Sequence, residues 1–447
     1  MIHITLITIL ILISPQIITL FPIQNLPSTF NFIHIQQTKT ITMADWSQLP
    51  RELLDLISKH LISETDLLRF RSVCTSWRSS IQPFNSRFPI LPHSGISNTT
   101  WGFFLSKRTI FRIGLSDLDH DLQQTHVPWL IKVERDNPSK THLMNPLAGS
   151  EFLPLLPNFP RSLNLINFRV LELGQEYVLQ YISYRPNANS IGDSATLYME
   201  KVAFCSCGVD GFVVLTVHVS GRLAVLKKGD LKWNVINELS QLTTPYDDVI
   251  LFNGEFYAVD GCARVVIVDW ETMSVKEVAG AVFGGDKKFL VECDGELLMV
   301  DKYLSLGVEN ELDDDVDEHY EFYEDDNDGL NERAVKVEVY KLDVGEHKWV
   351  EVKDLGDKML FVGDNCGFSA SALDFPGCKG NCVFFTGQDR EDDGLIKSKD
   401  VSVFDLESGS IGAVCNNSGY SQLFWPPPNW LLADSLAVED RLDNLNI

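Results

Sequence analysis

Two hairpin signatures, 41 residues apart, constrain the fold of this chain more than any other feature. The pair Asn253-Gly254 joins two apolar runs, and Asp294-Gly295 joins two more. Asn-Gly and Asp-Gly are preferred in two-residue type I′ turns, because both central residues need a positive φ. Each pair therefore predicts a β-hairpin, with strands at Val249–Phe252, Glu255–Val259, Phe289–Glu292 and Glu296–Val300.

A second echo supports an internal repeat. GDLKWNVI at 229–236 and GEHKWVEV at 345–352 each place Lys-Trp between a glycine turn and a β-type run. A period of about 40 to 50 residues with four-stranded units is typical of propeller blades. We therefore expect a mainly β domain over 96–434, with a pair of β-sandwiches as the competing fold. Further strands are expected at Gly211–Val219, Val265–Asp269, Val335–Leu342, Cys382–Thr386 and Val401–Leu406.

The segment Leu49–Ile81 has a different pattern, that of three short helices. Pro50 suits a first helical turn, because its fixed φ fits there and its missing N–H would have been unpaired. Leu53, Leu54 and Ile57 then recur at helical spacing. Three such helices cannot bury all their apolar side chains among themselves, so the segment predicts a protein partner.

The same segment closely resembles the F-box, the module that docks substrate receptors onto SCF-type ubiquitin ligases. The resemblance rests on L-P-x-E-L-L and on D-L-L-R-F-R-x-V-C-x-x-W-R-x-x-I. It implies an F-box domain at 43–84, a linker at 85–95, and a surface that binds the Skp adaptor. Some of the matching residues must instead hold the helices together. The implied contact residues are Leu49, Pro50, Leu53, Leu54, Ile57, Leu61, Leu67, Leu68, Val73, Cys74, Trp77 and Ile81.

The β-rich region carries a second, weaker resemblance. The run 145–149 (NPLAG) followed by Leu153-Pro154 is similar to an element of F-box-associated propellers. Val401–Gly409 and Phe424-Trp425-Pro426 also fit that pattern. Together these motifs resemble the plant F-box proteins whose second half is the kelch-like "domain of unknown function 295". The resemblance implies a kelch-like β-propeller after the F-box.

Composition excludes several classes of partner and compartment. With 62 acidic and 37 basic residues, the net charge is −25. Phosphate recognition needs clustered Lys and Arg, so we expect no nucleic-acid partner. Nine cysteines without a regular framework fit a reducing compartment, so we expect the nucleus or cytoplasm.

Residues 1–42 differ sharply from the rest, with no charged residue before Lys39. A secretory signal needs a basic start and a mitochondrial presequence needs several Arg, and the segment has neither. An apolar span would have to pass Pro15 and Pro22. We expect Met43 to be the functional start, with a targeting peptide or a membrane anchor as alternatives. A membrane partner is expected only if residues 1–42 are expressed.

One acidic stretch, 309–329, contains twelve acids in twenty-one residues. Such a stretch cannot pack as core, and we expect a solvated loop inserted between blade strands. An acidic lip that attracts a basic patch on a substrate is the functional alternative. A Ca²⁺ loop is less favoured, because the stretch lacks the D-x-D-x-D-G spacing of such loops. Residues 435–447 are expected to form a C-terminal tail.

We expect no catalytic site, no metal site and no cofactor site in this chain. Cys205 and Cys207 form C-x-C, and Cys378 and Cys382 lie near Cys366, but no His has a partnering spacing. We therefore expect buried strand or turn cysteines. Residues 284–288 lack the P-loop pattern and are expected to form a turn.

These patterns predict a non-catalytic receptor: the F-box binds Skp, and through it cullin and RING subunits, while the propeller binds an unknown target protein. The alternatives are an F-box/Skp scaffold without ubiquitin transfer, and a small-molecule-binding propeller, enzymatic or lectin-like, with a helical cap. Four aromatic residues are either mouth residues that contact the target or residues of the blade core and closure: Trp129, Tyr246, Trp425 and Trp430.

Overall fold

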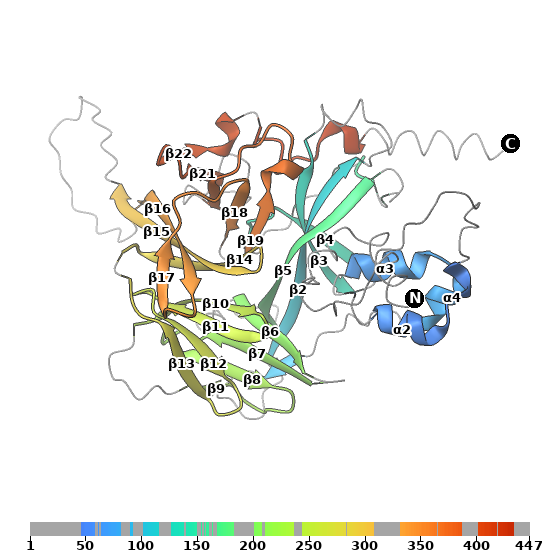
Figure 1. Ribbon diagram of the computed structural model, residues 1–447, viewed down its shortest axis with the longest axis horizontal. Helices are drawn as coiled ribbons and strands as arrows, with labels where there is room; N and C mark the ends of the chain where they lie inside the picture. The colour runs from blue at the N-terminus through green and yellow to red at the C-terminus, as the bar shows by residue number, and fades with distance from the viewer. Residues whose placement is uncertain are drawn as a thin grey trace, which may run out of the picture. The chain divides into compact units, whose positions relative to one another are not determined.

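The computed structural model forms two compact units, residues 1–86 and 87–447 (Figure 1). The described residues are 46–58, 61, 64–81, 90–92, 102–115, 127–137, 140–149, 153, 156, 158–160, 163, 168–182, 201–207, 211–236, 244–282, 284–307, 331–363, 365–386, 401–417 and 419–432. The expected N-terminal extension 1–42, the acidic loop 309–329 and the tail 435–447 lie outside these ranges.

The first unit is helical, and the three expected helices are confirmed. A 3₁₀ turn, η3 (Trp46–Gln48), precedes α2 (Arg51–Ser58), α3 (Glu64–Ser72) and α4 (Thr75–Ser80). Pro50 immediately precedes α2, and its carbonyl accepts the N–H groups of Leu53 and Leu54 at 3.1 Å. Within the described ranges, no helix combines the length and apolar character needed to cross a bilayer.

The second unit is built mainly from antiparallel strands, and the mainly β propeller class is confirmed. Its described strands are β1 (Ile90–Pro92), β2 (Gly102–Leu115), β3 (Trp129–Asn137), β4 (Lys140–Met144), β5 (Phe168–Ile182), β6 (Lys201–Cys207), β7 (Gly211–Val217), β8 (Leu223–Lys227), β9 (Asn234–Val235), β10 (Tyr246–Phe252), β11 (Glu255–Asp260), β12 (Val265–Asp269), β13 (Ser274–Ala279), β14 (Lys287–Cys293), β15 (Glu296–Gly307), β16 (Asn331–Asp343), β17 (Lys348–Glu351), β18 (Lys358–Val362), β19 (Gly367–Ser371), β20 (Cys382–Thr386), β21 (Val401–Asp405) and β22 (Ser410–Ala413). β1 lies inside 85–95, the segment expected to be a linker, and it pairs with β2.

The described strands group into successive sheets in chain order. β1–β5 form one group of strands and β6–β9 a second group. Two residue pairs between β5 and β6 join the groups into one sheet. β10–β13 and β14–β17 form four-stranded sheets, and β18–β22 form a five-stranded sheet with β18 parallel to β20. Contacts run from β5 to β6, then β10, β14 and β19, and from β19 back to β5. The sheets therefore surround a closed ring of inner strands, as blades of a propeller do (Figure 1).

Both predicted hairpin turns are confirmed. Asn253 and Gly254 have φ of 50° and 82°, and Asp294 and Gly295 have φ of 51° and 76°. In each hairpin the turn joins the first two strands of a four-stranded sheet, β10 to β11 and β14 to β15. The Lys-Trp echo occupies the far end of a blade in both copies, where Trp233 and Trp349 are buried. The sequence repeat therefore corresponds to the blade.

The segment 414–432 closes the ring by packing on the last and first blades. Phe424 and Leu423 are fully buried in a core that also holds Phe384 of β20 and Leu130 of β3. Leu423 O accepts the N–H of Leu130 at 2.8 Å. Farther along, Leu431 packs with Trp129. The closure thus depends on a segment whose described residues form no strand, held by side-chain packing and by the backbone hydrogen bond to β3.

Four aromatic residues were expected either to contact the target at the propeller mouth or to belong to the blade core and closure. In the structure they belong to the core and the closure. Trp129 is fully buried, with its ring centroid 6.2 Å from that of Trp425. Trp430 packs against Phe168 at 6.0 Å. Tyr246 is buried under the Arg264 guanidinium, 5.8 Å from the ring centroid. Trp129 and Tyr246 are therefore core residues, whereas Trp425 and Trp430 are half-buried residues of the closure.

Candidate docking surface and propeller cavity

The helical unit has a small core of four buried side chains. Leu54 and Ile57 of α2 are 1% and 0% exposed, and they meet Phe70 of α3 and Trp77 of α4. The Phe70 and Trp77 ring centroids lie 4.5 Å apart. Each helix contributes to this core, so the three helices hold one another in place.

Two arginines fix α3 against α4 through backbone carbonyls. The Arg71 guanidinium donates to the carbonyls of Arg78, at 3.2 Å, and of Ile81. In return, Arg78 Nε donates to the Arg71 carbonyl at 3.2 Å. These bonds satisfy carbonyls at helix ends, which otherwise have no partner within the helix. They hold the short helix α4 in a fixed position against α3.

The outward side of the same helices carries exposed apolar side chains. Leu56 and Leu68 are each 50% exposed, and Val73 is 52% exposed. Leu53 and Leu67 are half-buried residues of α2 and α3. Exposed large apolar side chains on so small a unit are typical of protein-binding surfaces. We call these five residues the docking face.

Burial sorts the twelve predicted adaptor contacts into groups. Leu54, Ile57 and Trp77 are core residues, and Leu49, Leu61, Cys74 and Ile81 pack around that core. The remaining five lie outside that cluster: Pro50, Leu68 and Val73 are exposed, and Leu53 and Leu67 are half-buried. Adaptor contact by these five stays a prediction. Leu56 was not in the predicted set, although its position three residues after Leu53 signals an outward stripe on α2.

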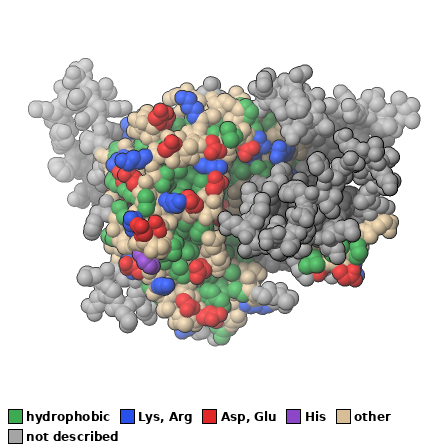
Figure 2. Space-filling model, in the orientation of Figure 1, with side chains coloured by type: hydrophobic (Ala, Val, Ile, Leu, Met, Phe, Trp, Pro, Cys, Tyr) green, Lys and Arg blue, Asp and Glu red, His purple; other side chains and the backbone are tan. Residues whose placement is uncertain are grey.

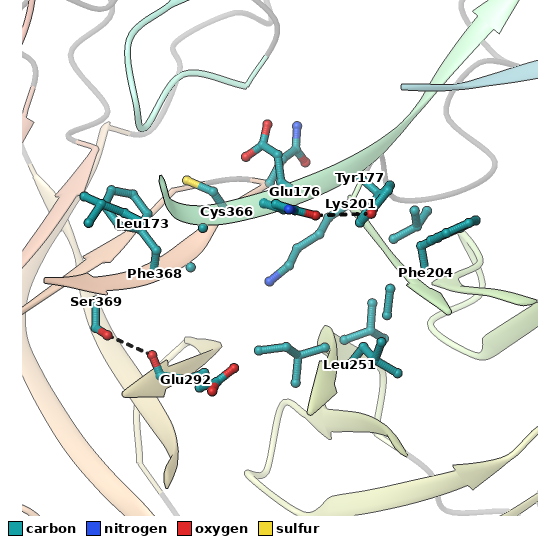
Figure 3. A pocket seen from close by; sticks show the side chains of 18 of the residues that line it. Leu173, Glu176, Tyr177, Lys201, Phe204, Leu251, Glu292, Cys366, Phe368 and Ser369 are labelled. Atoms are coloured by element: carbon teal, nitrogen blue, oxygen red, sulfur yellow. Dashed lines mark hydrogen bonds between the residues drawn. The ribbon is translucent and has the colours of Figure 1, made fainter. Parts of the chain in front are cut away.

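The propeller unit contains a cavity of about 520 Å³ among its inner strands. Figure 3 shows Glu176 and Tyr177 of β5, Lys201 and Phe204 of β6, Leu251 of β10, and Phe368 and Ser369 of β19 around it. Tyr177 donates from its hydroxyl to Gln175 Oε1 at 3.3 Å. A volume of about 300–1,000 Å³ is usual for ligand pockets, so the cavity is large enough for a ligand or a side chain of a partner.

A buried network of four charges supports β2, β3 and β5 beside this cavity. Arg108 bonds Glu134, with Nε 2.5 Å from Oε2, and pairs with Glu176 at 3.2 Å. Lys132 Nζ lies 3.0 Å from Glu176. Burial disfavours the charge on Arg108, but Glu176 and Glu134 outweigh it and raise the pKa of Arg108.

The network also anchors the motif 145–149. Lys132 Nζ donates to the Ala148 carbonyl at 2.5 Å, and Arg108 donates to the Gly149 carbonyl. Cys366 Sγ lies 3.3 Å from the Pro146 carbonyl, which ties the motif to the turn before β19. The motif therefore joins the first and last blades, which gives its resemblance to other propellers a physical basis.

A second buried pair allows a pH test of the blade interior. Lys288 and Asp301 lie 3.1 Å apart with fully buried side chains. Burial raises the pKa of Asp301, and Glu338 and Asp247 add to the rise against the opposing effect of Lys288. Since the folded-state pKa lies above the unfolded one, the carboxylate costs stability as pH rises and costs least at low pH.

Replacing the cation should expose that cost. We expect Lys288→Met to lower the free energy of unfolding by about 3–5 kcal/mol at pH 7, because Asp301 stays buried without its partner. The loss should shrink as the pH falls toward 5. Denaturant unfolding at both pH values measures it, with Lys288→Met/Asp301→Asn as the control that removes the charge. An equal loss at both pH values would contradict this assignment.

The cysteines occur as free thiols, all nine of them. Cys378 Sγ lies 3.2 Å from the Gly419 carbonyl, and Cys382 Sγ lies 4.0 Å from the Tyr420 hydroxyl. Burial raises the pKa of both thiols to about 12. These two thiols therefore remain protonated at neutral pH. In the part of the chain that the structure describes, no three His, Cys, Asp or Glu side chains gather as metal ligands.

The comparisons with known proteins agree with both units. The F-box-like family matches residues 46–84, and the KIB1-4 beta-propeller family matches residues 102–405. The chain belongs to the plant F-box proteins that carry this β-propeller.

Two relatives from Arabidopsis thaliana extend over almost the whole chain. "F-box protein SKIP23" is 45% identical over 90% of this chain and 98% of its own length. "F-box protein At2g17036" is 35% identical over 89% of this chain and 97% of its own. A solved structure of Synechocystis apocarotenoid oxygenase covers 72% of this chain and 82% of its own at 12% identity, but its TM-score of 0.27 supports no conclusion.

Proposed function

We propose that this protein is the substrate-recognition subunit of an SCF-type E3 ubiquitin ligase. The observation that carries the proposal is the docking face: exposed leucines and a valine on an F-box whose own core is already complete. An F-box implies binding to a Skp-type adaptor in general. Through that adaptor the chain would join cullin and RING subunits.

Its contribution would be proximity and not bond chemistry. The propeller would hold a target protein while another subunit presents ubiquitin as a thioester. Binding both partners in one assembly raises the effective concentration of target lysines near that thioester. The catalytic residues would lie on other subunits, so this chain would be a non-catalytic adaptor.

The surface and the thiols suit a protein target in the nucleus or cytoplasm. On the face seen in Figure 2, Lys and Arg side chains are interspersed with Asp and Glu. Such mixing does not favour a phosphate backbone, which needs clustered cations. Free cysteines are typical of a reducing compartment, where thiols stay reduced.

Reconstitution tests the proposal. The full chain is assembled with purified Skp, cullin and RING subunits, E1, E2 and ubiquitin, and proteins that co-purify with it from plant extract are added. We expect ubiquitin conjugates on at least one co-purifying protein, lost when residues 43–84 are deleted. Adaptor binding without any conjugate would instead favour an F-box/Skp scaffold.

A further inference from the structure

The charges that border the propeller cavity are balanced, with one exception. Lys201 Nζ lies 2.7 Å from Asp248, and Lys132 Nζ lies 3.0 Å from Glu176. At the turn after β14, Asp294 pairs with Lys358 at 2.9 Å. Glu292 also lines the cavity, yet among the described residues no Lys, Arg or His pairs with its carboxylate. Among the described residues, the cavity therefore has one uncompensated negative charge, and it is carried by an exposed side chain.

The propeller repeat shows that the fold does not require this charge. Glu292 in β14 corresponds to Leu251 in β10: each lies two residues before the first residue of its I′ turn. The cross-strand partners also correspond, Phe256 for Leu251 and Leu297 for Glu292. Both side chains border the same cavity. A leucine occupies the position in one blade, so blade packing does not require the exposed carboxylate in the next blade.

The remaining walls suit a cation on an aliphatic stem. Leu173, Leu251 and Phe368 offer apolar surface (Figure 3). Ser369 Oγ, which donates to the Glu292 carbonyl at 3.0 Å, lies on the same side as Glu292 and has lone pairs to accept a bond. Lys and Arg side chains match this arrangement, because their methylene stems cover apolar surface while their charged ends seek acceptors. The net charge of −25 adds long-range attraction for a basic segment.

We propose that the cavity receives a Lys or Arg side chain of the target protein, with Glu292 as its counter-ion. This inference rests on the proposed function, because the side chain that enters the cavity belongs to the target protein. It gives that target a chemical class: a segment with an exposed basic residue that can enter a cavity about 520 Å³ in volume. A hydrogen bond between two charged groups is stronger than one between neutral groups, so the site should prefer a basic side chain over a neutral one.

A peptide-bead screen tests the cavity directly. The full chain, fluorescently labelled, is incubated with one-bead-one-peptide heptamers of random sequence, and bright beads are sequenced. We expect at least fivefold enrichment of Lys or Arg at one position. The enrichment should disappear for Glu292→Gln and should change to Asp or Glu for Glu292→Lys. The matched control is Glu277→Gln, which removes an exposed carboxylate of β13 outside the cavity lining and should leave the preference unchanged.

The possible outcomes separate this inference from the ubiquitin-ligase proposal. No basic preference, or the same preference in Glu292→Gln as in the unmodified chain, would overturn the inference. A bound compound below 1,000 Da in the native mass spectrum, absent from Glu292→Gln and accompanied by no peptide preference, would overturn it in favour of a small-molecule site. Adaptor binding and ubiquitin transfer are measured separately. Their failure with the basic preference intact would refute the ligase role alone.

Discussion

Ending the chain after Ala413 should abolish cooperative unfolding of the propeller unit. The truncation removes Val414, Leu423, Phe424 and Leu431, all fully buried, together with the largely buried Tyr420. At about 1.5–3 kcal/mol for each buried side chain, the loss is on the order of 10 kcal/mol. A domain has only about 5–15 kcal/mol of stability in total. The first and last blades would also lose the packing that joins them.

Differential scanning calorimetry of the two truncations measures this effect. A chain that ends at residue 434 keeps the whole closure segment and is the matched control. We expect it to unfold in the same cooperative transition as the full chain, whereas the chain that ends at Ala413 should show no such transition. Equal unfolding of both truncated chains would show that 414–432 does not close the ring.

Replacing Trp77 by Ala should unfold the helical unit while the propeller stays intact. Trp77 is 3% exposed and supplies the largest side chain of a four-residue core. Removing a buried aromatic side chain costs about 3–5 kcal/mol, and units this small have little stability to lose. Trp77 was among the predicted adaptor contacts, so an adaptor-binding defect in this variant would follow from unfolding and would not identify a contact.

Hydrogen exchange followed by mass spectrometry distinguishes the two units. We expect peptides of α2, α3 and α4 to lose protection in Trp77→Ala, with protection of the β10–β13 sheet unchanged. Ser79→Ala, at an exposed position of the same helix, is the control and should exchange like the unmodified chain. Full protection of the helices in Trp77→Ala would contradict the assignment of Trp77 to the core.

Local signals predicted the helices and the repeat, because each depends on residues close in sequence. Asn253-Gly254 and Asp294-Gly295 specify their turns through positive φ, whatever the rest of the chain does. The helical spacing from Leu53 to Ile57 likewise predicts α2. The family resemblance added the order of the two domains.

Features that depend on distant contacts could not be predicted in this way. The closure brings Leu423 to Leu130, and no periodicity in 414–432 signals that partner. Lys132 and Glu176 look like solvent-facing strand residues in sequence, yet they form a buried pair. The distinction between core and docking face needed the packing of three helices, which is why Trp77 and Leu68 looked alike until their burial was known.

Binding of the purified Skp adaptor to the full chain tests the central claim most directly. Leu53→Glu/Leu68→Glu places two charges on the docking face and leaves the four core residues in place. Two interface anchors at about 2 kcal/mol each give a loss of at least about a hundredfold in affinity. Val219→Glu/Leu231→Glu makes the same change at exposed positions of the propeller unit and is the control.

Isothermal titration calorimetry gives the Kd of each chain, and thermal unfolding shows that each is folded. The account predicts that the adaptor binds the unmodified chain and the Val219→Glu/Leu231→Glu control with equal Kd, and Leu53→Glu/Leu68→Glu at least a hundredfold more weakly. An adaptor that fails to bind the unmodified chain, or that binds the folded Leu53→Glu/Leu68→Glu variant with the same Kd, would contradict it.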